Sequence, residues 1–224
     1  VMQVKPQLDR VLCTACHACV SVCPKECITM AEDELGFLRP QIDETACVGC
    51  GLCEKTCNAV KNIPACPGQK IYAARHKTED VVKSSASGGV FTALSDAVLQ
   101  MGGVVVGARY TEGMAVEHVI ARTAGERDAL RGSKYTYSLC DKKIFVQTRE
   151  MLQEGTVVLF TGTPCQVAAL KTFLGKDYDN LFAADILCHG IAAPVLYRDF
   201  IAEIEEKIIN YANKIVYKKL FGYD

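Results

Sequence analysis

The sequence predicts two joined domains: a small α+β domain over residues 1–66 and a larger α/β domain over residues 67–224 with a mostly parallel sheet. Three observations predict this division. Ten of the 13 cysteines fall in the first 66 residues, in a spacing pattern that occurs twice. Pro64, Pro67 and Gly68 then form a rigid connector. Beyond it, strand-like apolar runs alternate with helix-like segments, as in an α/β fold.

The first domain is organised by a run of four cysteines that occurs twice, at a separation of 34 residues. Both runs have the spacing C-x2-C-x2-C-x3-C, at Cys13, Cys16, Cys19 and Cys23 and at Cys47, Cys50, Cys53 and Cys57. This spacing is typical of two-cluster bacterial ferredoxins, in which the fourth cysteine of each run ligates the other [4Fe-4S] cluster. We therefore expect Cys57 to join the first three cysteines at one cluster, and Cys23 to join Cys47, Cys50 and Cys53 at the other.

Zinc and disulfides explain this pattern less well. Zinc knuckles use separated CxxC pairs, and a disulfide framework needs an oxidising compartment, for which the N-terminus carries no secretory signal. Pro24 follows the first run as the motif expects, but Asn58 stands at the corresponding place in the second. Cys27 and Cys66 lie outside the runs and are interpreted as small core or surface residues. His17 is interpreted as an exposed loop residue.

Two short strands and two glycines complete the expected ferredoxin-like domain. Residues 27–30 and 37–40 read as strands around an acidic turn. Gly49 and Gly51 permit the positive-φ turns that aim N–H groups at a cluster. Because the domain has few large apolar side chains, cluster ligation must supply much of its stability.

The second domain is predicted from alternating periodicity. Asp141 is expected to cap a helix that Gly155 ends. The expected helices are 90–101, 142–154, 167–174 and 194–209, and the expected strands are 104–108, 116–121, 157–160 and 181–187.

Two cysteines of this domain follow predicted strands, in the turns that line the ligand crevice of a parallel sheet. Cys165 precedes a helix, whose N-terminus favours a thiolate, and Cys188 follows the next strand. We expect the two sulfurs to approach one another. Two other interpretations remain open: both are inert small residues, or Cys165 is a nucleophile with His189 as its base.

A Ser/Gly segment before the helix at residue 90 is a candidate anion cradle, because Gly88 and Gly89 let backbone N–H groups face a phosphate. The alternative is an ordinary helix entrance capped by serine.

Four segments of the chain, in order, resemble the beta-subunit family of coenzyme F420-reducing hydrogenases and dehydrogenases, here with a fused N-terminal ferredoxin domain. They are residues 85–91 (SASGGVF), 132–135 (GSKY), 162–166 (GTPCQ) and 185–190 (DILCHG). The resemblance implies that the α/β domain binds a flavin, FAD rather than FMN, and that Lys134 faces a phosphate or the reduced flavin. The cofactor-binding residues it implies are Ser87, Gly88, Gly89, Ser133, Lys134, Tyr135, Thr163, Cys165 and Cys188.

In that family, the positions of Cys165 and Cys188 look like ligands of a further [4Fe-4S] cluster, which here requires downstream ligands beyond residue 224. The predicted function is an iron–sulfur flavoprotein oxidoreductase that passes electrons between a flavin, possibly served by coenzyme F420, and two [4Fe-4S] clusters. The alternative is a non-catalytic electron carrier or scaffold whose α/β unit docks a partner.

Charge and hydropathy exclude other classes. The chain has 25 basic and 26 acidic side chains, so no basic face for nucleic acid is expected. No apolar run approaches the ~18 residues of a membrane span. We expect a cytoplasmic protein, as a homo-oligomer or hetero-oligomer, whose partner is a redox protein or a small electron donor or acceptor.

Overall fold

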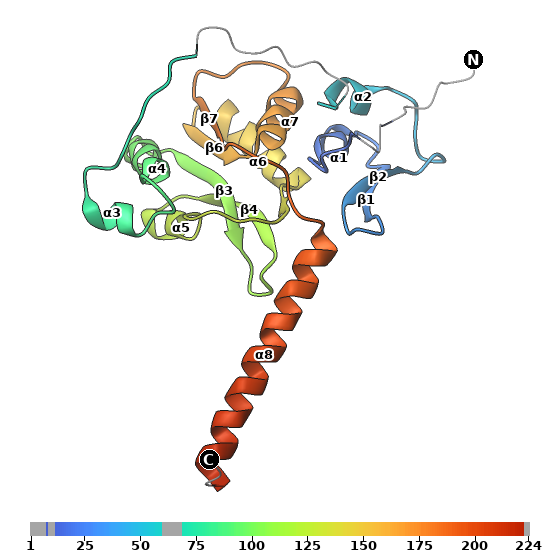
Figure 1. Ribbon diagram of the computed structural model, residues 1–224. Coiled ribbons are helices and arrows are strands. Elements are labelled where there is room, and N and C mark those ends of the chain that lie inside the picture. Colours follow the sequence, from blue (N-terminus) through green and yellow to red (C-terminus); the bar gives the residue numbers. More distant parts are fainter. Residues whose placement is uncertain (1–7, 9–11, 60–68, 222–224) are drawn as a thin grey trace.

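The computed structural model describes residue 8 and residues 12–59 and 69–221 of the chain. A small ferredoxin-type unit lies beside an α/β unit (Figure 1). The two units meet where α1 (Ala18–Val22) of the small unit contacts α6 (Lys142–Gln153) and α7 (Pro164–Leu174) of the larger one. Helix α8 (Pro194–Phe221) extends away from both units (Figure 1).

The small unit contains the expected pair of antiparallel strands, β1 (Ile28–Glu32) and β2 (Leu38–Ile42). Asp33 stabilises the turn between them, because its carboxylate accepts the N–H groups of Leu35 and Phe37. The structure adds two short helices that the sequence did not predict, α1 and α2 (Leu52–Thr56), one at the same place in each cysteine run.

The α/β unit is built on one five-stranded sheet in the order β5-β4-β3-β6-β7. The strands are β3 (Val104–Tyr110), β4 (Val116–Ala121), β5 (Ser138–Leu139), β6 (Val158–Gly162) and β7 (Leu181–Asp185). Strand β3 pairs with β4 antiparallel, and the other three neighbouring pairs are parallel. The mostly parallel sheet predicted from the sequence is therefore confirmed.

Helices cover both faces of this sheet, because successive side chains of a strand point to opposite sides. Val106 and Phe160 pack on one side with Phe145 of α6 and Leu170 of α7. On the other side, Val105 packs with residues that include Val98 of α4 (Val90–Gln100). All but Val98, which is 4% exposed, are at most 1% exposed, so the central strands form a well-packed core that holds the strand ends in place.

Most predicted elements are found, with differences at their ends. Asp141 caps α6 as predicted, through the N–H of Ile144. Helix α7 begins earlier than predicted, at Pro164, because proline suits the first helical position. Helix α8 runs twelve residues beyond the predicted end at 209. The short helices α3 (Glu79–Lys83) and α5 (Ala124–Asp128) were not predicted. Within the described ranges, no helix is both long and apolar enough to span a membrane.

Candidate functional site

The eight cysteines of the two runs surround two separate cavities. One cavity, called here the first cluster cavity, is lined by Cys13, Cys16, Cys19 and Cys57. The other, the second cluster cavity, is lined by Cys23, Cys47, Cys50 and Cys53. The fourth cysteine of each run therefore lies with the first three of the other run, which is the grouping expected for crossed ligation.

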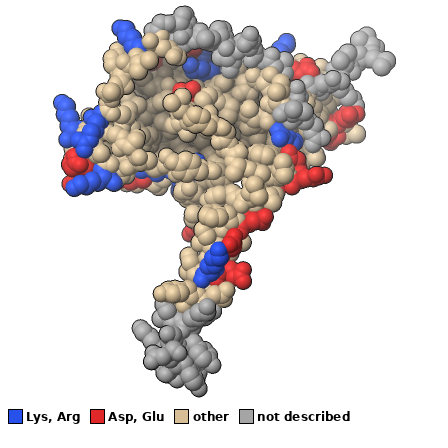
Figure 2. All heavy atoms as spheres, viewed as in Figure 1, with Lys and Arg blue, Asp and Glu red and all other residues tan. Residues whose placement is uncertain are grey.

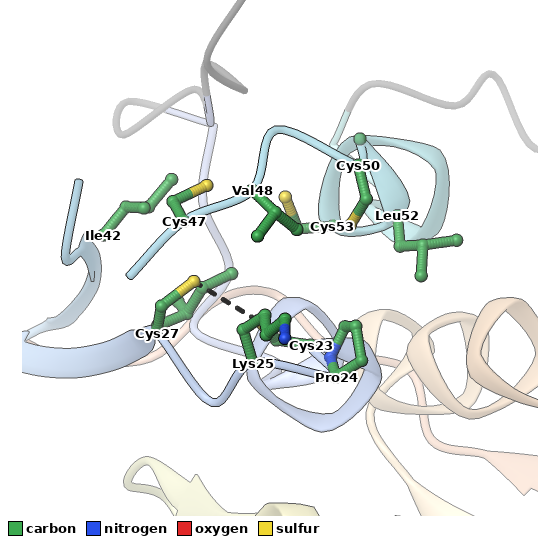
Figure 3. Close-up of a pocket in the computed structure, with 12 residues that line it drawn as sticks. Cys23, Pro24, Lys25, Cys27, Ile42, Cys47, Val48, Cys50, Leu52 and Cys53 are labelled. Carbon is green, nitrogen blue, oxygen red and sulfur yellow. Dashed lines mark hydrogen bonds between the residues drawn. The ribbon is translucent and has the colours of Figure 1, made fainter. Parts of the chain in front are cut away.

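Figure 3 shows the second cluster cavity between the Cys23–Cys27 turn on one side and, on the other, the loop with Cys47 and Cys50 and the helix α2 with Cys53. Cys27 belongs to this cavity although it lies outside the motif. It is buried, and its sulfur is 3.5 Å from that of Cys23. The interpretation of Cys27 as a small buried residue is consistent with this place, whereas Cys66 lies outside the described residues.

The backbone around both cavities repeats as the sequence does. Gly49 and Gly51 have φ of 64° and 70°, and the equivalent Ala15 and His17 have φ of 55° and 61°. These left-handed turns are the positive-φ conformation expected at Gly49 and Gly51. For a non-glycine residue, such a conformation costs on the order of 1–2 kcal/mol.

His17 is not the exposed loop residue expected from the sequence. It is 8% exposed and lines the first cluster cavity, because α1 packs against the α/β unit on this side. Its Nε2 atom is buried and has no hydrogen-bond partner among the described residues. Buried polar atoms of this kind are normally hydrogen-bonded, and a sulfur-rich cluster bound in the cavity would offer an acceptor.

Burial favours the protonated form of two thiols in the first cluster cavity. Burial raises the pKa of Cys16, and it raises that of Cys19 to about 12. Such thiols ionise only when a metal compensates the buried charge. Among the described residues, no three His, Cys, Asp or Glu side chains are close enough to hold a single metal ion. The sulfurs are instead distributed around the two cavities, and these residues fit one [4Fe-4S] cluster in each.

A third and much larger cavity, called here the large cavity, opens beside the first cluster cavity and has a volume of about 590 Å³. It is lined by the ends of β3, β4 and β6, by the loops at 85–91 and 130–138, and by the first turn of α7. The charged groups among its described lining residues are Arg39, Arg131 and Lys134, with no carboxylate. In the view of Figure 2, charged side chains gather over α3 and the upper part of α8, away from the largely uncharged hollow between them.

The large cavity brings together most of the cofactor-binding residues that the resemblance implied. These are Ser87, Gly89, Ser133, Lys134, Thr163, Cys165 and Cys188. Gly88 and Tyr135 are not among its lining residues. Gly88 is instead packed against the chain at residues 74–76: a Cβ there would meet the Ala74 carbonyl oxygen at 2.7 Å, and the His76 N–H donates to the Gly88 carbonyl. The side chain of Tyr135 is exposed.

Helix α4 begins without a serine cap. Its N-cap is Gly89, with φ of 77° and no side-chain capping bond, so the serine-capped entrance considered above is not found. Ser84 and Ser85 donate instead to the Val81 carbonyl. The N–H groups at the start of α4 therefore lie at the cavity without a serine cap.

The ammonium of Lys134 is held by the chain itself. It donates to the carbonyls of Leu130, Arg131 and Gly132 at 2.8–3.1 Å, and burial lowers its pKa. The Arg131 guanidinium pairs with Asp128 at 3.0 Å and donates to the Ser84 hydroxyl at 3.3 Å, but its buried Nε atom has no hydrogen-bond partner among the described residues. The buried Thr92 hydroxyl at the same cavity also lacks a partner among them, and the sequence singled out neither residue.

Cys165 and Cys188 share the large cavity, but each sulfur has partners in its own turn. The Cys165 sulfur is 3.0 Å from the Thr163 hydroxyl, and the Cys188 sulfur accepts the N–H of Gly190 at 3.4 Å. Cys165 was expected to precede the helix, but α7 begins at Pro164 and places Cys165 within its first turn.

His118 is a buried group at the large cavity that sequence reasoning missed. It faces inward from β4, and its two ring nitrogens lie 2.8 Å from the Ser138 hydroxyl and 3.1 Å from the Thr161 carbonyl oxygen. Burial lowers its pKa to about 4, so the imidazole is neutral. With the Thr161 carbonyl as acceptor, Nε2 carries the proton and Nδ1 accepts from Ser138. Its place at alternate buried positions of a strand was the only sequence signal.

The first cluster cavity and the large cavity share a wall made by Cys13 and Thr14, whereas the described lining residues of the second cluster cavity include none of the large cavity. Two cavity residues hold this wall. Arg39 donates to the Cys13 carbonyl at 2.6 Å, and the Tyr137 hydroxyl donates to the Ala15 carbonyl at 2.8 Å. The first cluster cavity is therefore the one that adjoins the large cavity.

Asn58, the departure from the ferredoxin motif, makes a second connection. Its Nδ2 donates to the Cys165 carbonyl at 2.9 Å, and its Oδ1 lies 3.8 Å from the Cys16 sulfur. Proline at this position has no side-chain polar atom and cannot make either contact. The proline of the motif is thus replaced by asparagine at a position where the small unit contacts α7.

Comparison with known families matches two parts of the chain. Residues 12–60 match the model of the 4Fe-4S dicluster domain, and residues 71–144 match that of coenzyme F420 hydrogenase/dehydrogenase, beta subunit N-term. These matches confirm the resemblance predicted from the sequence.

Among solved structures, the chain is similar to one in the F420-reducing [NiFe] hydrogenase complex from Methanosarcina barkeri, studied by xenon derivatization. The two are 23% identical over 48% of this chain and 38% of that chain, with a TM-score of 0.36. The alignment thus spans less than two fifths of that chain. No curated protein matches the sequence.

Proposed function

From a chain that joins a 4Fe-4S dicluster domain to an N-terminal domain of the coenzyme F420 hydrogenase/dehydrogenase beta-subunit type, we propose an iron–sulfur flavoprotein oxidoreductase. In this proposal FAD occupies the large cavity, and the eight cysteines of the two runs hold two [4Fe-4S] clusters. The two domains extend over residues 1–66 and 67–224.

The single observation that carries the proposal is the wall of Cys13 and Thr14 shared by the first cluster cavity and the large cavity. A bound flavin supplies the conversion between two-electron and one-electron transfer that single-electron clusters cannot perform alone. Arg39, whose guanidinium pairs with Asp33 at 3.0 Å, supports this wall by donating to the Cys13 carbonyl. In this proposal, the first cluster is the one that exchanges electrons directly with the flavin in the large cavity.

The large cavity has the size and chemistry for a dinucleotide flavin. Its volume lies within the range of about 300–1,000 Å³ that is usual for small-molecule sites. Arg131 has a buried Nε donor to offer a phosphate, and the α4 N-terminus at Gly89 presents backbone N–H groups. His118, held neutral, adds no charge to the cavity wall.

Two classes of redox partner are compatible with this arrangement. A two-electron donor or acceptor, such as a deazaflavin of the coenzyme F420 class, would exchange a hydride with the flavin. A redox protein would exchange single electrons with the second cluster, whose Cys50 is exposed. We place this exchange in the cytoplasm.

Anaerobic purification followed by cofactor extraction tests the proposal. The wild-type chain should retain about eight iron atoms and one FAD. Arg131→Gln should weaken FAD binding about tenfold or more, because it removes a charged hydrogen-bond donor. The matched control is Arg109→Gln, an exposed arginine paired with Glu117 and absent from the cavity lining.

Two results would count against this function. Eight iron atoms without flavin would refute the flavoprotein and leave an electron carrier or scaffold. Equal FAD affinity in both arginine variants would refute the place assigned to the flavin phosphates.

A further inference from the structure

The repeat within the small unit isolates one residue that departs from its counterpart. His17 and Gly51 occupy the same place in the two cysteine runs, directly after the second cysteine, and both are left-handed N-caps of a five-residue helix. The φ and ψ angles are 61° and 5° at His17, and 70° and 6° at Gly51. Glycine adopts this conformation without strain, whereas histidine is strained there by on the order of 1 kcal/mol or more.

The side chain of His17 is also costly to bury. It is 8% exposed, and its Nε2 atom has no hydrogen-bond partner among the described residues. Its main-chain carbonyl accepts the N–H and the hydroxyl of Ser21, so the unpartnered atom of interest is in the ring. An unpaired buried polar group costs about 1–3 kcal/mol. Backbone strain and an unpaired buried ring atom thus both destabilise the folded chain at His17, whereas the other run has Gly51 at this position.

The missing partner is to be found in the cavity that His17 lines. The other polar or sulfur-containing side chains among its described lining residues are Cys13, Cys16, Cys19 and Cys57, with Thr14, Met30 and Asn58. The Asp141 carboxylate, at the start of α6, is the charged group near the ring. An imidazole carries at least one N–H, and in a [4Fe-4S] site the sulfur atoms are the acceptors in reach of the cavity wall.

We propose that His17 is a tuning residue of the first cluster: its Nε2–H donates a hydrogen bond to a sulfur atom of that cluster and raises the cluster's reduction potential. The inference rests on the iron–sulfur part of the proposed function and does not require the flavin. Hydrogen bonds to cluster sulfur stabilise the reduced form, which carries one more negative charge.

The consequence is an asymmetry between two clusters with the same ligand spacing. The second cluster has Gly51 where the first has His17, so it lacks this donor. The first cluster, beside the large cavity, is then easier to reduce than it would be without the histidine. In the reaction itself the cluster gains one electron and no atom: [4Fe-4S]2+ becomes [4Fe-4S]+, and an external reductant such as dithionite supplies that electron.

The test substitutes the residue that the other run uses. His17→Gly removes the N–H donor and at the same time relieves the backbone strain, so loss of folding is not expected. The matched control is Ala15→Gly, which relieves the same kind of strain two residues earlier, at φ of 55°, without removing a side-chain donor. His17→Gln restores a donor of similar reach.

The measurement is a redox titration of each anaerobically purified full chain, followed by the EPR signals of its two reduced clusters. In His17→Gly, one of the two midpoint potentials should fall by about 59 mV, which is a tenfold change in the one-electron equilibrium constant. The other potential should stay as in the wild type, and iron content should remain at about eight atoms. Ala15→Gly should leave both potentials unchanged, and His17→Gln should recover part of the shift.

Three results would overturn the proposal. Unchanged potentials in His17→Gly would show that the ring faces Asp141 rather than the cluster. An equal shift in Ala15→Gly would assign the effect to the backbone. Loss of four iron atoms in His17→Gly would make the residue structural. A chain without flavin but with shifted potentials would refute the flavoprotein and leave this inference standing.

Discussion

Crossed ligation, in which each cluster takes three cysteines from one run and one from the other, predicts which pairs of cysteine substitutions remove one cluster and which remove both. Cys13 and Cys57 belong to different runs but line the same cavity, whereas Cys13 and Cys47 begin the two runs and line different cavities. Removing two sulfurs from one cavity should therefore destroy one cluster, and removing one sulfur from each cavity should damage both.

The expected iron content of each variant follows from the number of intact clusters it can hold. The wild type should hold about eight iron atoms in two intact [4Fe-4S] clusters. Cys13→Ala, Cys57→Ala and the double variant Cys13→Ala/Cys57→Ala should each keep one intact cluster. The double variant Cys13→Ala/Cys47→Ala should keep none. Cys23 is avoided as a target because the Cys27 sulfur, 3.5 Å away, offers a replacement ligand.

The assay is iron analysis together with spin quantitation by EPR after reduction with dithionite, on protein purified without oxygen. Cys140→Ala is the control, since Cys140 is a buried cysteine outside both cluster cavities. Cys13→Ala/Cys47→Ala should lose both clusters under either arrangement, so the deciding variant is Cys13→Ala/Cys57→Ala. If that variant lost both clusters, each run would hold its own cluster and the reasoning from the cavities would be wrong.

Two further predictions concern the α/β unit. His118 has a pKa of about 4 in the folded chain against about 6.5 when unfolded, so the unfolded chain binds more protons between these values. Stability should therefore fall by roughly 3 kcal/mol as the pH drops through this window, and His118→Asn should lose this part of the pH dependence in urea unfolding. Leu170→Ala should lower the free energy of unfolding by about 2–5 kcal/mol, because Leu170 is fully buried between α7 and the sheet.

A different result would contradict each of these two predictions. Equal pH slopes in wild type and His118→Asn would show that another group titrates in this range. For Leu170, the control is Leu196→Ala in α8, where the side chain is 64% exposed and a change within about 0.5 kcal/mol is expected. Similar losses in the two leucine variants would contradict the position of the core.

Local patterns in the sequence predicted the cysteine-based grouping and the sheet because each depends on local spacing. The C-x2-C-x2-C-x3-C runs predicted which sulfurs face a cluster, and short apolar runs predicted β3, β4 and β6. The helix from Asp141 was predicted because a capping aspartate and a terminating glycine flank it. Helices of five residues, such as α1 and α5, are too short to show a period.

Local sequence patterns could not predict the contacts between the two units. Asn58 looked like a weakened motif until the structure placed it between Cys16 and the Cys165 carbonyl. His17 was expected to be exposed because it lies in the loop of the first cysteine run, but α1 packs on α6 and α7 and His17 is buried. Gly88 and Tyr135 were assigned to the cofactor by resemblance, but their positions depend on how the loops at 74–76 and 130–138 fold.

The most direct measurement of the central claim is an optical and EPR spectrum of the anaerobically purified chain before and after dithionite. The account predicts a brown protein whose broad visible absorption bleaches on reduction, with about two reduced-cluster spins per chain. A colourless protein that contains zinc, or one whose motif cysteines are joined in disulfides, would contradict it.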